Sequence, residues 1–267
     1  MRNHPLWKRF DAHPMQLPAP VTTKTFPSMR TALLVCHHAR SRMNCLDCVA
    51  GQASIRDDVT MQRPILFDLD RTLVDLQNHT DYAAALADLH SLLEGWSEFE
   101  VLDADWDAPT LECMAILVAL SNDPRWGPAS AAVAAHERAA IPRSTPMPGL
   151  AEVGAACVGT PYAVVTLLPP DVAREVLDHH GFPVEVIIGR DPGIRAKPYG
   201  DGLVAAAQLL GVDVEGCVMI GDSSWDRAAA VDAGGGFIGV PATSSAFASD
   251  VLTASSLVEA VWMARSR

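Results

Sequence analysis

Two aspartates separated by one residue follow a short apolar run early in the chain. The run is residues 65–67, and the acids are Asp68 and Asp70. Side chains alternate along a strand, so both carboxylates point the same way if extended backbone continues past Phe67. Two negative charges at such a short distance repel one another, unless a cation or a shared proton offsets the repulsion. The pair therefore indicates either a divalent metal site or two carboxylates held in different protonation states for acid and base chemistry.

Other reactive side chains also lie where predicted strands end. Thr166 follows an apolar run at 162–165, and Asp222 follows another at 217–220, with Asp226 close behind. Lys197 lies in the loop after a third run at 184–188. In parallel sheets the ligand binds beyond the carboxyl ends of the strands. We therefore expect these groups to converge on Asp68.

Apolar strands alternate with helical segments through the second half of the chain. This alternation predicts an α/β fold, a Rossmann-like parallel sheet with helices on both faces. Predicted strands lie at 65–67, 162–165, 184–188, 217–220 and 237–240, and predicted helices at 150–158, 170–181, 201–210 and 224–233. A last helix should begin at a capping box formed by Ser256 and Glu259.

A helical insert interrupts this pattern. Residues 77–145, here called the helical insert, contain helical spacing at 82–93, 111–120 and 129–140. We expect three parts: a core of 61–76 and 146–267, the insert as a helical cap domain, and a poorly ordered extension at 1–60. The insert carries three arginines against eleven acids. Its tryptophans, Trp96, Trp106 and Trp126, either line a substrate face or form the core of the insert.

The constellation fits phosphoryl transfer, which needs an in-line nucleophile, a cation and groups that hold the phosphate. Asp68 can attack as a carboxylate and form an aspartyl-phosphate. Asp70 can protonate the leaving alcohol and then deprotonate the hydrolytic water. The expected substrate is a small phosphorylated metabolite, and the acidic insert favours monophosphates over nucleoside di- and triphosphates.

The remaining groups would hold the metal and the phosphate. Asp222, with Asp68, would bind Mg²⁺, which prefers oxygen ligands. Thr166 would donate its hydroxyl to a phosphate oxygen, and Lys197 would neutralise charge on the phosphate and the nucleophile. Asp226, four residues after Asp222 and so predicted on the same helix face, can orient the metal ligands or Lys197.

These residues resemble, in order, the four motifs of the haloacid dehalogenase-like (HAD) hydrolases. The motifs are Asp68-Leu-Asp70-Arg-Thr72-Leu73, Thr166, Lys197-Pro198, and Gly221-Asp222-Ser223-Ser224-Trp225-Asp226. The resemblance covers about residues 63–260 and is greatest to the phosphoglycolate phosphatase-like branch, which has a helical C1-type cap. It implies a Rossmann-like core, dependence on Mg²⁺, the roles given above, and the main-chain carbonyl of Asp70 as a further metal ligand.

Two positions depart from the family pattern. Arg71 stands where the family usually has glycine, and its side chain could alter substrate access or add an anion contact. Leu167 follows Thr166 where asparagine is common, so a frequent phosphate contact is absent. Neither change removes the predicted nucleophile, acid or metal ligand.

Three other activities are compatible with such a chain. A dehalogenase would use Asp68 but needs neither a metal nor an acid at Asp70. A phosphomutase shares the core and differs in cap residues. A non-catalytic phosphate-binding protein could lose Asp68 or Asp70, and this chain retains both.

Composition narrows the partners and the compartment. A net charge of −12 argues against nucleic acid, because phosphate backbones attract a surplus of Lys and Arg. No apolar run approaches the ~20 residues that cross a bilayer, so no membrane partner is expected. Six cysteines in 267 residues fit free thiols in a cytoplasmic enzyme.

Residues 1–60 have their own composition, with eight Lys or Arg against four Asp and five prolines. No sustained periodicity predicts a core here, which is why we expect a poorly ordered extension. A zinc site is an alternative, from Cys36-His37-His38 with Cys45 and Cys48, and an organelle transit peptide is another. We favour a translated leader with no role in the fold.

Overall fold

A five-stranded parallel sheet lies at the centre of the fold, in the strand order β5-β4-β1-β6-β7. The strands are β1 (Ile65–Phe67), β4 (Tyr162–Val165), β5 (Val186–Ile188), β6 (Val218–Gly221) and β7 (Gly236–Gly239). The predicted α/β class is therefore confirmed in this computed structural model. It describes residues 62–101, 104–240 and 247–266, all within a unit running from Asp57 to Arg267. The extension predicted at 1–60 and its alternative zinc site lie outside the described residues.

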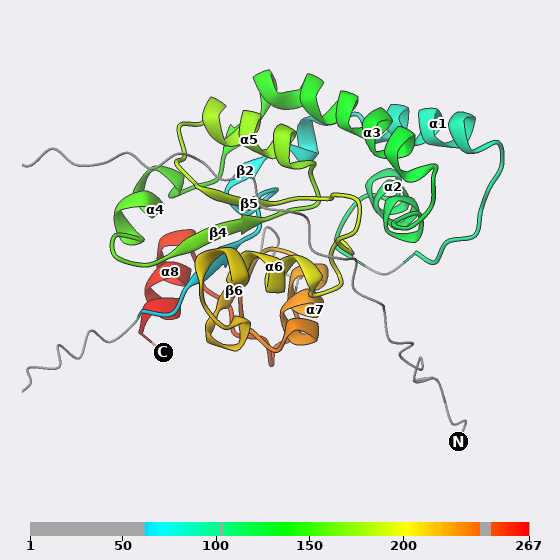
Figure 1. The fold of residues 1–267 in the computed structure, drawn as a ribbon. Helices are drawn as coiled ribbons and strands as arrows, with labels where there is room; N and C mark the ends of the chain where they lie inside the picture. Colours follow the sequence, from blue (N-terminus) through cyan, green and yellow to red (C-terminus); the bar gives the residue numbers. More distant parts are fainter. Residues whose placement is uncertain (1–61, 102–103, 241–246, 267) are drawn as a thin grey trace, which may run out of the picture. The chain divides into compact units, whose positions relative to one another are not determined.

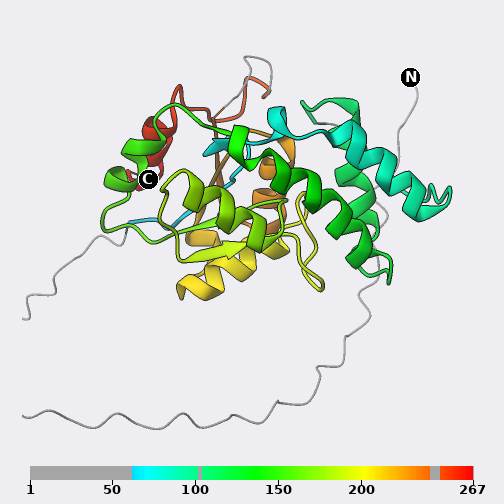
Figure 2. The same ribbon diagram turned by 90° about the horizontal axis from the view of Figure 1, so that it is seen from above.

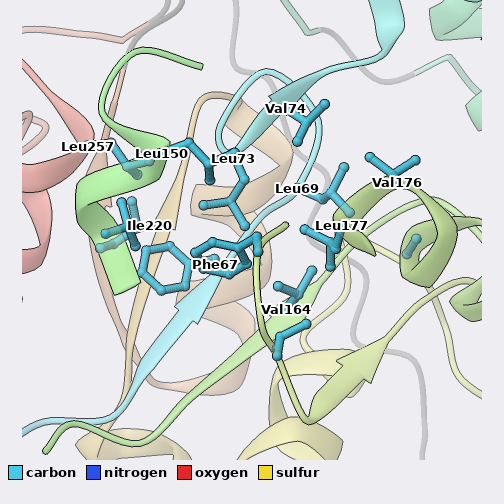
Figure 3. Close-up of a cluster of buried hydrophobic side chains, with 14 of the residues drawn as sticks. Phe67, Leu69, Leu73, Val74, Leu150, Val164, Val176, Leu177, Ile220 and Leu257 are labelled. Carbon is cyan, nitrogen blue, oxygen red and sulfur yellow. The ribbon is translucent and has the colours of Figure 1, made fainter. Parts of the chain in front are cut away.

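Helices cover both faces of this sheet, as a doubly buried parallel sheet requires. On one face, α4 (Leu150–Ala156), α5 (Pro170–His179) and α8 (Leu257–Arg265) pack against Phe67, Val164 and Ile220. Figure 3 shows this cluster, with Phe67 at its centre. On the other face, α6 (Asp201–Leu210) and α7 (Ser224–Ala233) pack against Leu66 and Met219. The alternation of Leu66 and Phe67 between faces follows from strand geometry, and Figure 1 shows β1 within the sheet.

The helical insert leaves and re-enters the core through a two-stranded antiparallel ribbon. Its strands are β2 (Val74–Asp75) and β3 (Thr145–Pro146), which flank the insert on either side. Between them come η1 (Gln77–His79), α1 (Tyr82–Leu93), α2 (Ala108–Ala119), α3 (Trp126–Ala140) and η2 (Ile141–Arg143). Figure 2 shows α1 and α3 side by side. The insert has its own apolar cluster, which includes Leu89, Ile116 and Val133.

Capping residues set helix boundaries that the apolar pattern misses. α2 begins at Ala108, three residues before the predicted start, because the Asp107 side chain accepts a hydrogen bond from the Thr110 main-chain N–H at 2.8 Å. The capping box predicted for α8 is only half formed: Ser256 accepts from the Glu259 N–H, but the Glu259 carboxylate binds Ser255.

Two sequence expectations concern the whole chain. Among the described residues, no helix is long and apolar enough to span a membrane. The described cysteines, Cys113, Cys157 and Cys217, are buried and unpaired.

Candidate active site

The carboxyl ends of three neighbouring strands bring Asp68, Thr166 and Asp222 together. β1 lies between β4 and β6, so the residues that follow these strands meet at one edge of the sheet. The Asp68 N–H donates to the Ile220 carbonyl at 2.8 Å, which continues the β1–β6 ladder by one residue. Asp68, Asp70, Thr166, Lys197 and Asp222 all line a single cavity.

Lys197 lies at the centre of the charged groups. Its Nζ donates to Asp68 Oδ1 at 2.5 Å and to Asp226 Oδ1 at 2.6 Å. Burial by itself lowers the pKa of Lys197, but the charges of Asp226 and Asp68 outweigh it and raise the pKa above its ordinary value. The lysine is therefore a fixed positive charge beside Asp68, although it lies in a loop where a solvated side chain is the ordinary expectation.

Asp226 reaches Lys197 from the first turn of α7. Its Oδ2 accepts from the N–H and hydroxyl of Ser223, at 3.0 and 2.6 Å, and the Ser223 hydroxyl in turn caps the Asp226 N–H. This is a complete capping box. The sequence argument that Asp222 and Asp226 share a helix face is wrong, because α7 begins at Ser224, after Asp222.

Burial raises the pKa of both Asp68 and Asp70, and different neighbouring groups modify the effect at each residue. Burial raises the pKa of Asp68 to about 6; the charge of Lys197 opposes this effect and that of Asp226 adds to it. Burial also raises the pKa of Asp70 to about 7, although its Oδ1 accepts hydrogen bonds from the N–H groups of Gln77 and Leu76, both at 2.9 Å. Two carboxyl groups of one cavity thus titrate near neutrality.

The carboxylates have a donor set that suits a hard divalent cation. One oxygen from each of Asp68, Asp222 and Asp226 lies within 4.8 Å of the others, and all three residues are buried. Burial, followed by the charges of Asp68 and Asp226, raises the pKa of Asp222 well above its ordinary value. A dication would relieve this repulsion, and carboxylate oxygens are the ligands that Mg²⁺ prefers. Lys197 and Ser223 occupy both carboxylate oxygens of Asp226, whereas Lys197 contacts one oxygen of Asp68 and Arg71 one oxygen of Asp222. Asp68 and Asp222 are therefore the better candidates.

Arg71 binds the carboxylate of Asp222. Its Nε lies 3.2 Å from Asp222 Oδ2, and its Nη1 donates to the main-chain carbonyl of Asp105 in the insert at 2.8 Å. The backbone of Arg71 has a φ of 60°, in the left-handed region that favours glycine. The arginine side chain is therefore buried between Asp222 and the insert, where it offsets the charge of the carboxylate.

Thr166 has a hydroxyl that is already oriented. Its Oγ1 accepts from the Leu168 N–H at 3.2 Å, which leaves the hydroxyl hydrogen for another acceptor. The neighbouring Leu167 also lines the cavity. Its side chain offers no hydrogen bond at that position.

A buried ion pair joins α3 to the loop after β5, and the sequence analysis missed it. Arg190 donates to both carboxylate oxygens of Glu137, at 2.8 and 2.7 Å, and to the Leu167 carbonyl at 2.8 Å. Arg190 is 3% exposed and Glu137 is fully buried. The sequence did contain a sign that Glu137 is buried: it lies four residues after Val133, so the two side chains share the buried face of an alanine-rich helix.

The three tryptophans of the insert take different positions. All three pack against the apolar cluster of the insert, and Trp106 also lines the cavity. Trp225, from the last motif, joins the same cluster, with its ring centroid 5.0 Å from that of Trp106. The prediction that these tryptophans form the core of the insert thus agrees with the packing of all three, and a substrate face at Trp106 stays a prediction.

A sequence model described as haloacid dehalogenase-like hydrolase matches residues 63–234. The chain belongs to this family. The match spans both the core and the helical insert, and it confirms the resemblance drawn from the four motifs. The HAD family is one of hydrolases, so this HAD chain is an enzyme of that class.

Solved structures share the fold of this HAD protein. A hydrolase from Pseudomonas syringae is 18% identical, with a TM-score of 0.58 over 75% of this chain and 96% of that chain. CbbY from Rhodobacter sphaeroides, in complex with phosphate, is 21% identical, with a TM-score of 0.56 over 74% and 96%. A proposed phosphoglycolate phosphatase from Lactobacillus delbrueckii subsp. bulgaricus is 18% identical, with a TM-score of 0.54 over 78% and 100%. No curated protein matches the sequence. At these identities the similarity establishes the shared fold.

Proposed function

We propose that this HAD-family protein is a Mg²⁺-dependent phosphatase that hydrolyses a small phosphate monoester through an aspartyl-phosphate on Asp68. The observation that carries the proposal is the contact between Lys197 Nζ and Asp68 Oδ1 in a cavity shared with Asp70. The pairing keeps a buried carboxylate charged and oriented, as a nucleophile requires. CbbY structures that hold phosphate and xylulose-(1,5)bisphosphate add support, because they have the same fold.

In the first half-reaction, a carboxylate oxygen of Asp68 attacks phosphorus. The bond between phosphorus and the leaving alcohol oxygen breaks, and Asp70 gives that oxygen its proton. A pKa of about 7 makes Asp70 suitable, since a fraction of the side chain is protonated at neutral pH and it can later accept a proton. The hydroxyl of Thr166 and the ammonium group of Lys197 hold the phosphoryl oxygens during this step.

In the second half-reaction, water attacks the phosphorus of the aspartyl-phosphate. Asp70 takes a proton from the water, the bond between phosphorus and the Asp68 oxygen breaks, and inorganic phosphate leaves. Asp68 and Asp222, together with the main-chain carbonyl of Asp70, would hold Mg²⁺. The bound ion would offset negative charge on the carboxylates and the phosphoryl oxygens.

The helical insert would act as the cap over this site, with residues 61–76 and 146–267 as the catalytic core. The cavity lies between the insert and the core, because Tyr82 and Met114 line it from the insert and Asp68 and Lys197 from the core. Movement of the insert away from the core would open this cavity to a substrate.

Hydrolysis of p-nitrophenyl phosphate with and without Mg²⁺ tests the proposal. We expect turnover only with the metal, and a loss of at least about 10³-fold in kcat for Asp68→Asn, since the nucleophile is removed. Asp178→Asn, at an exposed position on α5, is the matched control and should keep full activity. Quenching a reaction with radiolabelled substrate in acid should leave label on Asp68. Turnover that persists in excess chelator would contradict the metal assignment, and an active Asp68→Asn enzyme would contradict the mechanism.

A further inference from the structure

Among the described residues, the side chains of the insert that line the cavity carry no charge. They are Gln77 of η1, Tyr82 of α1, Trp106, and Thr110 and Met114 of α2. Thr110 and Met114 are four residues apart, so they lie on one face of α2. On the proposed function, this surface lies opposite Asp68 and Asp70 and would contact the leaving alcohol of the substrate.

The cationic groups near the cavity are already engaged. Lys197 is the cation among the described lining residues, and it binds Asp68 and Asp226. Arg71 is bound to Asp222, and Arg190 to Glu137. A second anionic group on the substrate would therefore lie among carboxylates and would have to compete with them for Lys197, Arg71 or Arg190, which is unfavourable.

One lining residue has an unused hydrogen-bonding group. Thr110 is 2% exposed, and its Oγ1 has no hydrogen-bond partner among the described residues. The Asp107 cap is taken by the Thr110 main-chain N–H and leaves the hydroxyl free. Buried polar side chains in native proteins nearly always have a partner, so each exception calls for an explanation.

We propose that Thr110, Met114 and Trp106 form the binding subsite for the leaving group. The substrate class is a monophosphate ester of an uncharged alcohol that carries a second hydroxyl. The Thr110 hydroxyl hydrogen-bonds that second hydroxyl, and the hydrocarbon part of the alcohol contacts Met114 and Trp106. This inference rests on the proposed phosphatase function and adds to it the polarity and charge of the leaving group.

Three esters that differ at one feature test the subsite. Glycerol 3-phosphate has an uncharged leaving group with hydroxyls, 3-phosphoglycerate replaces its terminal hydroxymethyl group by a carboxylate, and n-propyl phosphate has no second hydroxyl. We expect kcat/KM for glycerol 3-phosphate to exceed that for n-propyl phosphate by about tenfold, the effect of one hydrogen bond. It should exceed that for 3-phosphoglycerate by at least about 100-fold, because the extra charge would lie among carboxylates.

Thr110→Val separates a binding role from a structural one. Valine has the same shape without the hydroxyl, so the glycerol 3-phosphate to n-propyl phosphate ratio should fall by about tenfold. The Tm of the variant should not fall, because the buried hydroxyl that it loses makes no hydrogen bond to the described residues. Thr110→Ser should keep the ratio, and so should Thr145→Val, a matched change at an exposed position of β3.

The outcomes distinguish this inference from the proposed function. If the wild type hydrolyses no phosphate ester in an Asp68-dependent way, the proposed function itself fails. If it hydrolyses p-nitrophenyl phosphate through Asp68 but prefers 3-phosphoglycerate, only the subsite is overturned. Equal losses on all three esters with a lowered Tm for Thr110→Val would also overturn the subsite, since the hydroxyl would then be structural.

Discussion

Replacing Arg71 by glycine should destabilise the metal-free protein and strengthen its binding of Mg²⁺. The Nε atom of Arg71 lies 3.2 Å from Oδ2 of Asp222, whose carboxylate we propose as a metal ligand. Arginine and a divalent cation would compete for that carboxylate. Glycine removes the competing charge and also suits the φ of 60° at this position.

The magnitude follows from two opposing effects. Removing one partner of a buried ion pair costs about 3–5 kcal/mol, and the two side chains are 11% and 4% exposed. Relief of the left-handed backbone returns about 1 kcal/mol, so the net loss is about 2–4 kcal/mol without metal. For a folded unit of this size the Tm should fall by about 4–16 °C.

Thermal unfolding in excess chelator and in saturating Mg²⁺ measures both effects. If the loss of the guanidinium strengthens Mg²⁺ binding tenfold, the stabilisation by Mg²⁺ grows by about 1.4 kcal/mol. The Mg²⁺-induced rise in Tm should then be about 3–6 °C larger in Arg71→Gly than in the wild type. Titration calorimetry with Mg²⁺ alone gives the change in Kd directly.

Two control variants separate charge from backbone. Arg71→Ala removes the ion pair but keeps a side chain at positive φ, so it should lose about 1 kcal/mol more than Arg71→Gly. Arg195→Ala breaks an exposed pair with Asp201 and should cost at most about 1 kcal/mol, with no change in the response to Mg²⁺. The reasoning would be refuted by a metal-free Arg71→Gly protein as stable as the wild type, or by an unchanged Kd for Mg²⁺.

Two further predictions concern contacts away from the metal ligands. Glu137→Gln leaves the charge of Arg190 unpaired in a buried network, so chemical denaturation should show that the free energy of unfolding falls by about 3–5 kcal/mol. The control Glu175→Gln, in an exposed pair, should lower it by at most about 1 kcal/mol. Equal losses in the two variants would contradict the assigned network. Gly189→Ala puts a methyl group against a backbone carbonyl and should lower the free energy of unfolding by about 1–3 kcal/mol. The control Gly154→Ala, in α4 with open space around it, should raise the free energy of unfolding by about 0.4–1 kcal/mol. A stabilised Gly189→Ala protein would show that the loop can adjust.

The sequence by itself determined the order of elements and the edge of the sheet at which the polar groups lie. Buried parallel strands are short apolar runs, and the residue after such a run lies at the carboxyl end of the strand. Asp68, Thr166 and Asp222 could therefore be assigned to one edge without coordinates. Lys197 could be placed only in a nearby loop, because no periodicity fixes a loop side chain.

Only the tertiary structure decided which charges meet. Arg190 pairs with Glu137, 53 residues away, and Arg71 crosses from Asp222 to the insert carbonyl of Asp105. Such pairs depend on how the insert packs against the core, and local sequence patterns carry no information about which distant segments come into contact.

The same holds for the groups that face the reaction centre. Thr110 looks like an ordinary residue in the first turn of a helix, and only the packed structure leaves its hydroxyl buried with no partner in the described part of the chain. Local propensity and periodicity fix helices, strands and their faces, since these depend on neighbours along the chain. Cavity walls, buried ion pairs and raised pKa values arise when distant segments exclude water together, and they are therefore properties of the folded structure.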